Sequence, residues 1–172
     1  MPQINQDLLL NLIPHLETWW GVLEVIVAAI GLFLVVSGLV GLSGRQDGGK
    51  KRALLTLIAG TLMLNAPSLL DAFAQTLFTQ NSAEVLSYHP PDSNPASGYI
   101  RLAVLAVALT GLIGVARGLY LMRLSPGEGG GLARALVHMT GGVICVNLVE
   151  FLKLLAASLG GDVEILVTSI LG

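Results

Sequence analysis

The chain has 172 residues, of which 53% are hydrophobic and 12% are charged, and its formal net charge is −2. Soluble domains carry about 25% charged residues, so this composition and a mean hydropathy of +0.77 indicate a membrane protein. The small net charge gives no general attraction to nucleic acid. The single cysteine, Cys145, excludes an internal disulfide.

Residues 1–20 are an amphipathic segment that ends in two adjacent tryptophans. Tryptophan concentrates at the membrane–water boundary, so we expect a short interfacial helix that breaks or starts near Pro14. The first apolar span follows from about Gly21 to Leu42, and Glu24 is its one charged residue.

A Gly-rich polar turn at residues 43–52 leads into the second span, from Ala53 to about Phe78. Pro67 lies inside this span, where a proline removes a backbone hydrogen bond and kinks a helix. Residues 21–78 therefore form a first helical hairpin. The Pro-rich loop at 79–98, which has no Lys or Arg, separates it from the second half.

The second half has the same organisation. A third span from Tyr99 to about Leu124, a Gly-rich turn and a fourth span to about Leu159 form a second hairpin, residues 99–159. The tail, residues 160–172, starts with Gly-Gly-Asp and then becomes apolar. It caps the last helix, lies on the membrane, or continues the helix after a break.

The two halves also contain similar stretches. Residues 53–70 align with residues 135–152 at an offset of 82, so that a glycine followed five residues later by an asparagine occurs twice. Residues 31–39 align with residues 111–119 at an offset of 80. Self-similarity of this kind indicates a duplicated unit. Because two spans separate the copies, the repeat is parallel, unlike the inverted repeats of many transporters. The expected fold is all-α, with four hydrophobic helices in two tandem hairpins.

Basic residues gather at the hairpin turns. The second turn is flanked by Arg123 and Arg134, and the first turn carries Arg45, Lys50, Lys51 and Arg52. The positive-inside rule places both turns in the cytoplasm, and both termini and the Pro-rich loop outside. We expect the four cations of the first turn to face a lumen or phosphate groups of lipid or DNA.

Small residues on the spans predict close helix packing. The glycines expected at helix contacts are Gly31, Gly38, Gly60, Gly111, Gly118 and Gly142. The polar residues expected at helix contacts are Asn65, Asn147, Glu150 and Lys153.

A buried amide needs partners, so we expect each asparagine to bond across to another helix. Glu150 and Lys153 are three residues apart on one helical face and should form an ion pair, within the chain or between subunits. Glu24 and Arg101 lie near the outer ends of their spans, where they pair with each other or reach water.

Arg117 either reaches the cytoplasmic boundary with its long side chain or faces a polar lumen. The sequence has no Ser/His/Asp arrangement, no paired carboxylates and no phosphate loop. It therefore predicts a protein without enzymatic activity and without a cofactor, apart from bound phospholipid.

Residues 59–78, AGTLMLNAPSLLDAFAQTLF, and residues 138–147, HMTGGVICVN, resemble small multi-pass proteins of type IVB secretion systems. These are the IcmC/DotE-type proteins of the Dot/Icm machinery and the TraQ-type proteins of IncI-class conjugative plasmids. The resemblance implies a part in bacterial conjugation or effector secretion at the inner membrane, with other secretion-system membrane proteins as partners.

The architecture also resembles that of conjugative pilins, which are small helical hairpins with outside termini and a short basic turn that faces the lumen after assembly. The chain departs from ordinary pilins in its size, in its duplication and in lacking a long cleaved leader.

The expected function is therefore that of a self-associating subunit of a type IVB conjugation or secretion apparatus. Its concrete form is a pilin-like subunit, resident in the bacterial inner membrane or assembled into an extracellular pilus that passes single-stranded DNA. The alternative is a small transporter or channel, which needs polar residues along a water-filled path at mid-membrane. A third hypothesis is a scaffold for other membrane proteins.

Overall fold

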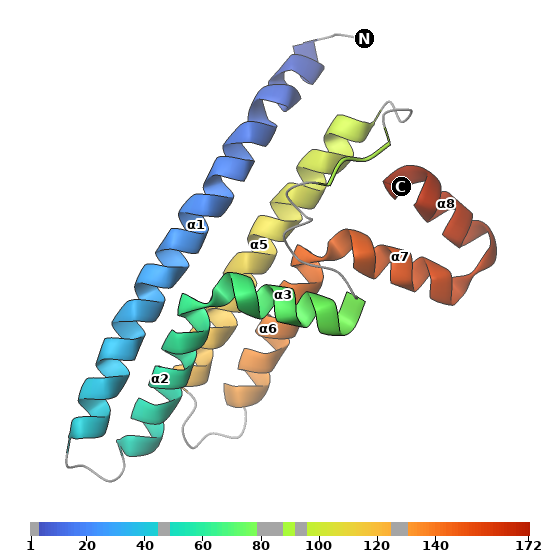
Figure 1. Ribbon diagram of the computed structural model, residues 1–172. Helices are drawn as coiled ribbons and strands as arrows, with labels where there is room; N and C mark the ends of the chain where they lie inside the picture. Colours follow the sequence, from blue (N-terminus) through green and yellow to red (C-terminus); the bar gives the residue numbers. More distant parts are fainter. Residues whose placement is uncertain (1–3, 45–48, 79–87, 92–95, 125–130) are drawn as a thin grey trace.

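A computed structural model describes residues 4–44, 49–78, 88–91, 96–124 and 131–172, and Arg45 lies outside these ranges. The described residues form helices and no strand, which confirms the all-α class. The helices are α1 (Ile4–Ser43), α2 (Lys50–Leu64), α3 (Ala66–Phe78), α5 (Ser97–Arg123), α6 (Gly131–Val146), α7 (Leu148–Leu159) and α8 (Gly161–Leu171) (Figure 1).

Two antiparallel helix pairs make up the body of the protein. Helix α1 packs along α2, α5 packs along α6, and the pairs meet mainly through α5, which contacts both α1 and α2. The first residues of α2 and α6 and the last residues of α1 and α5 lie at the same end of the molecule (Figure 1). Helices α3 and α7 leave their pairs sideways, and α8 folds back beside α7.

The number of apolar spans depends on how the bent arms are counted. Among the described residues, Asn11–Ser43 of α1 and Ser97–Arg123 of α5 are each long and apolar enough to cross a membrane. The second arm of each pair qualifies only as a bent combination, α2 with α3 at 82° and α6 with α7 at 88°. The four expected spans are thus present only if each bent pair is counted as one span, and by length and composition the described residues offer two to four spans.

The N-terminal segment also differs from expectation. It is the first part of the 40-residue helix α1, with Pro14 inside the helix, and not a separate interfacial helix. The physical reason is a continuous buried stripe with seven-residue spacing, which runs through Ile13, Trp20, Val27 and Leu34. Packing along this stripe offsets the backbone hydrogen bond that Pro14 cannot donate.

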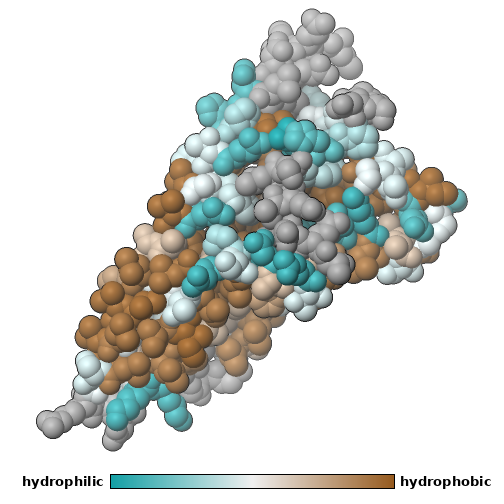
Figure 2. Space-filling model, viewed as in Figure 1, coloured by the Kyte–Doolittle hydropathy of each residue, from teal (hydrophilic) through white to brown (hydrophobic). Residues whose placement is uncertain are grey.

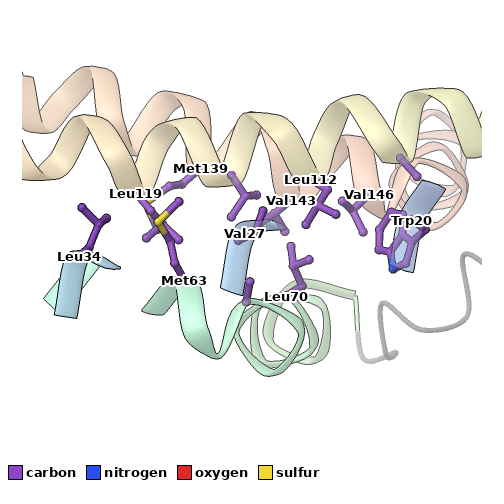
Figure 3. Packing of buried hydrophobic residues seen from close by; sticks show 13 residues of the cluster. Trp20, Val27, Leu34, Met63, Leu70, Leu112, Leu119, Met139, Val143 and Val146 are labelled. Atoms are coloured by element: carbon purple, nitrogen blue, oxygen red, sulfur yellow. The ribbon is translucent and has the colours of Figure 1, made fainter. Parts of the chain in front are cut away.

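One hydrophobic cluster joins the two pairs. It includes residues of α1, α2, α3, α5 and α6, among them Trp20, Val27, Leu34, Met63, Leu70, Leu112, Leu119, Met139, Val143 and Val146 (Figure 3). Because a single cluster contains residues from both halves, the two pairs form one body.

Large apolar side chains also cover the outside. On α1 alone, Val25 is 70% exposed, and Phe33 and Val40 are each 66% exposed. Figure 2 shows hydrophobic residues gathered over the lower part of this face, with hydrophilic residues at the lower end and again above. Soluble monomers rarely expose a contiguous apolar patch of more than a few hundred Å², so this belt is typical of a surface in contact with lipid.

Each helix pair is held at a glycine-to-glycine crossing. A Cβ atom added to Gly142 would lie 2.6 Å from the carbonyl oxygen of Gly111, and one added to Gly60 would lie 2.8 Å from that of Gly31. Separations under 3.0 Å are not tolerated by real Cβ atoms. The backbones can therefore approach this closely only because both partners are glycine.

A substitution at the second crossing tests this packing. We expect Gly142→Ala to destabilise the protein by about 1–3 kcal/mol, since the new methyl group would push α5 away from α6. The matched control is Gly141→Ala, because a Cβ at Gly141 meets nothing within 4 Å. Alanine there should be neutral or stabilising by up to about 1 kcal/mol through its helix propensity. Reversible unfolding in detergent micelles measures both values, and equal destabilisation by the two variants would contradict the account.

Candidate functional site

The feature that the two halves share most closely is a right-angle elbow at an asparagine. Asn65 separates α2 from α3, and Asn147 separates α6 from α7. The backbone angles agree closely, with φ −107° and ψ 29° at Asn65, and φ −105° and ψ 38° at Asn147. The duplication seen in the sequence is thus a duplication of three-dimensional shape at these positions.

Each asparagine side chain bonds to its own helix. Nδ2 of Asn65 donates to the carbonyl oxygen of Thr61 at 2.9 Å, and Nδ2 of Asn147 donates to that of Val143 at 3.0 Å. The expectation that the amides bond across to another helix therefore does not match the hydrogen bonds observed. Asparagine suits this role because its short amide can bond to nearby backbone groups where the helix ends.

The elbow does not require proline. Pro67 lies in the first turn of α3, where its missing N–H is tolerated. The second copy has no proline after Asn147 and bends by 88°, compared with 82° in the first copy. The bend expected near Pro67 is therefore present in the first arm, and the second arm has an equivalent bend that was not expected, since the shared asparagine marks both.

The position of the elbows limits how far the second arms reach. At a rise of 1.5 Å per residue, the 15 residues of α2 extend about 22 Å and the 16 residues of α6 about 24 Å. A bilayer core is about 30 Å thick. Each straight arm is therefore about 6–8 Å shorter than the thickness of a bilayer core.

A cluster of polar groups lies towards the opposite end from the hairpin turns. Nη2 of Arg101 on α5 donates to Oε1 of Glu17 on α1 at 2.7 Å. Nε1 of Trp20 donates to Oε1 of Glu24 at 2.8 Å. Arg101 thus pairs with Glu17 and not with Glu24, and the ion pair connects the two halves.

Glu150 and Lys153 form an ion pair within α7, with Nζ 3.5 Å from Oε1. The expected pairing of these residues is therefore present in the structure. Because α7 lies nearly at a right angle to α6, the pair belongs to the sideways helix and not to a straight span.

The tail is a helix that folds back on the protein. Positive φ angles at Gly160 (66°) and Gly161 (61°) allow the sharp turn before α8. Leu171 is then buried in a cluster with Val104 and Val149, and the Tyr88 hydroxyl donates to the Leu171 carbonyl oxygen at 2.9 Å. Burial raises the pKa of the Tyr88 phenol above its usual value, which further favours the neutral hydroxyl that donates this hydrogen bond.

The remaining expected residues lie along the helix pairs. Lys50, Lys51 and Arg52 form the exposed first turn of α2. Arg117 is exposed on α5, six residues or about 9 Å before the end of that helix at Arg123. The six glycines lie at close contacts within each pair, namely Gly31, Gly38 and Gly60 between α1 and α2, and Gly111, Gly118 and Gly142 between α5 and α6.

Sequence reasoning missed Glu17 as the partner of Arg101. Counting residues back from the last residue of each helix could have found this partner. Glu17 is 26 residues before Ser43, and Arg101 is 22 residues before Arg123. If the last residues of α1 and α5 lie at the same level, Glu17 lies about 39 Å and Arg101 about 33 Å along the helices from that level. The difference between these heights is small enough for the long arginine side chain to span.

Comparison of the chain with known protein families, curated proteins and solved structures found no match. Among the described residues, no group of three or more His, Cys, Asp or Glu side chains is arranged to hold a metal ion.

A double-mutant cycle on Glu17 and Arg101 tests the connection between the halves. The two side chains are 37% and 21% exposed, so we expect Glu17→Gln and Arg101→Gln to show a coupling free energy of about 0.5–1 kcal/mol that falls with added salt. The comparison cycle on Glu150 and Lys153, a pair within one helix, should give about 0.2–0.5 kcal/mol. Unfolding free energies in micelles provide the data, and zero coupling between Glu17 and Arg101 would contradict the pairing.

Proposed function

We propose that the chain is a self-associating, non-enzymatic membrane subunit of a type IVB conjugation or secretion apparatus, resident in the bacterial inner membrane. The observation that supports a structural role is that the polar side chains along the helices bond to other groups of the same chain. Glu17 pairs with Arg101, Glu24 accepts from Trp20, and both asparagines bond to their own helices. These groups hold the fold together, and the outside offers mainly apolar surface for lipid and for neighbouring subunits.

The proposed placement in the bilayer follows from helix lengths and charge. The basic turns lie in the cytoplasm, and α1 and α5 cross the membrane. Helices α3 and α7 then lie in the outer boundary region, because an interfacial helix sits about 5–10 Å deep and the second arms end about 6–8 Å short of a full crossing. The Glu17–Arg101 pair reaches the outer boundary, where water and headgroups lower the cost of charge.

The parallel repeat supports self-association. The first helix pair contacts the second through α5, and the second pair has a similar shape with α6 at its free edge. Within one chain, the first helix pair binds the second. Because the second pair has a similar shape, it can bind the first pair of another chain in the same way, and repeated head-to-tail contacts of this kind give rings or filaments. The exposed apolar side chains Leu132, Leu136 and Val137 on α6 are available for such a contact.

The resemblance of residues 59–78 and 138–147 to type IVB proteins supplies the biological setting of this proposal. The sideways helices favour a subunit that stays in the membrane, because α3 and α7 would have to be repacked in a filament of straight hairpins. The pilin-like form is therefore the second version of the same proposal. A transporter has less support, because the polar residues that it would need are engaged within their own helices.

Deletion of the gene in its host tests the assignment. We expect loss of conjugative DNA transfer or effector delivery, restored by the full chain supplied in trans. We also expect cross-linking in native membranes to capture multimers of the chain. As a matched control, a Gly141→Ala chain should restore transfer fully.

Normal transfer in the deletion strain would contradict the role in the apparatus, and a monomer in cross-linked native membranes would contradict self-association. Purified surface appendages built mainly from this chain would replace the membrane-resident version with the pilin-like one.

A further inference from the structure

A pocket lies where the two helix pairs meet at their basic end. It has a volume of about 200 Å³ and opens to the surface. Helices α1, α2 and α5 all contribute to its wall, and the lining residues are Ser37, Gly41, Gly49, Arg52, Ala53, Thr56 and Arg123. The small residues make the space, and the two arginines come from different helix pairs.

Among the residues that the structure describes, the pocket lining includes two arginines and no carboxylate. Arg123 is held in place by Tyr120, with the guanidinium carbon 5.5 Å from the centre of the ring. Two cations facing one pocket beside an apolar belt repel each other, unless an anion lies between them. The charge arrangement therefore favours a negatively charged occupant.

The hydrogen-bond donors that remain also favour an anion. The hydroxyl of Ser37 donates to the carbonyl oxygen of Phe33, and that of Thr56 donates to the carbonyl oxygen of Arg52. A ligand therefore meets the two guanidinium groups. It also meets the start of α2, where Gly49 supplies no side-chain cap for the first N–H groups. Arginine binds phosphate oxygens in a two-pronged arrangement that matches this donor set.

The surroundings of the pocket indicate which kind of phosphate fits. Val40 lies three residues after Ser37 on α1, so the two are neighbours on the helix surface, and Val40 is 66% exposed. An anion that carries acyl chains can place its phosphate in the pocket and its chains along this apolar surface. A free phosphate gains nothing from the apolar surface.

We propose that this pocket binds the phosphate of one anionic phospholipid, which joins the two helix pairs at their basic end through Arg52 and Arg123. The proposal rests on the membrane placement given above and is independent of the role in conjugation. It adds Arg123 to the functional residues and gives Arg52 a specific ligand. Lys51, in the same turn, is exposed and is not among the residues that line the pocket.

The test uses the full chain in nanodiscs of phosphatidylcholine with a small fraction of phosphatidylglycerol, and native mass spectrometry counts the lipids retained. We expect one phosphatidylglycerol to be retained per chain. Arg52→Gln and Arg123→Gln should each reduce its affinity about tenfold, because each removes one charge-assisted pair of hydrogen bonds. Lys51→Gln removes the same charge from the same turn but does not line the pocket, so it should change the affinity less than twofold.

Further variants distinguish lipid binding at this pocket from general attraction of anionic lipid to positive charge. Arg52→Lys keeps the charge without the two-pronged geometry, so we expect an intermediate loss, and its helical content should equal that of the unsubstituted chain. Equal losses for Lys51→Gln and Arg52→Gln, or no loss for either arginine, would overturn the proposal. Displacement of the lipid by millimolar inorganic phosphate would replace the lipid with a free anion as the occupant.

The outcome is independent of the conjugation assay. A chain that retains phosphatidylglycerol through Arg52 and Arg123 but is dispensable for DNA transfer would overturn the role in the apparatus and leave the lipid site standing.

Discussion

The close approach of glycine backbones at two helix crossings is the constraint on which the rest of the structure depends. Carbonyl oxygens of Gly31 and Gly111 lie where a side chain on Gly60 or Gly142 would have to be. This contact fixes the distance and the direction of each second arm against its long helix. The asparagine follows each of these second glycines by five residues, so the crossing also fixes where each sideways helix begins.

The elbows make the two helices of each pair different in length. Helices α1 and α5 are long enough to cross a bilayer alone, whereas α2 and α6 support them for about 22–24 Å before turning. Both sideways helices, α3 and α7, follow the ends of α2 and α6 that point away from the first residues of α2 and α6, and those first residues lie together at the other end (Figure 1). One end of the molecule thus carries Lys50, Lys51, Arg52 and Arg123, and the other part carries the sideways helices and the Glu17–Arg101 ion pair.

Much of this organisation could be predicted from the sequence. Hydropathy gave the membrane class, and the recurring Gly-to-Asn step revealed the duplicated unit. The bend at Asn147 could not be predicted, because a helix end at an asparagine has no signal that distinguishes it from a polar residue inside a span. Pro67 drew attention to only one copy, and its place in the first turn of α3 is one that proline tolerates.

The continuity of α1 through Pro14 depends on burial of Ile13 and Trp20, which only the packed structure reveals. The partner of Arg101 is Glu17 on another helix, so spacing within one segment could not identify it.

The central claim is that the second arm of each half turns sideways at its asparagine, and a distance in the second half tests it most directly. Spin labels on cysteines at Leu136 and Leu159, both exposed, would report on α6 and α7 after Cys145→Ala removes the native thiol. A bend of 88° at Asn147 predicts a backbone separation of about 25 Å between the labelled positions in nanodiscs, whereas one straight helix predicts about 35 Å. A single distribution centred near 35 Å would contradict the account.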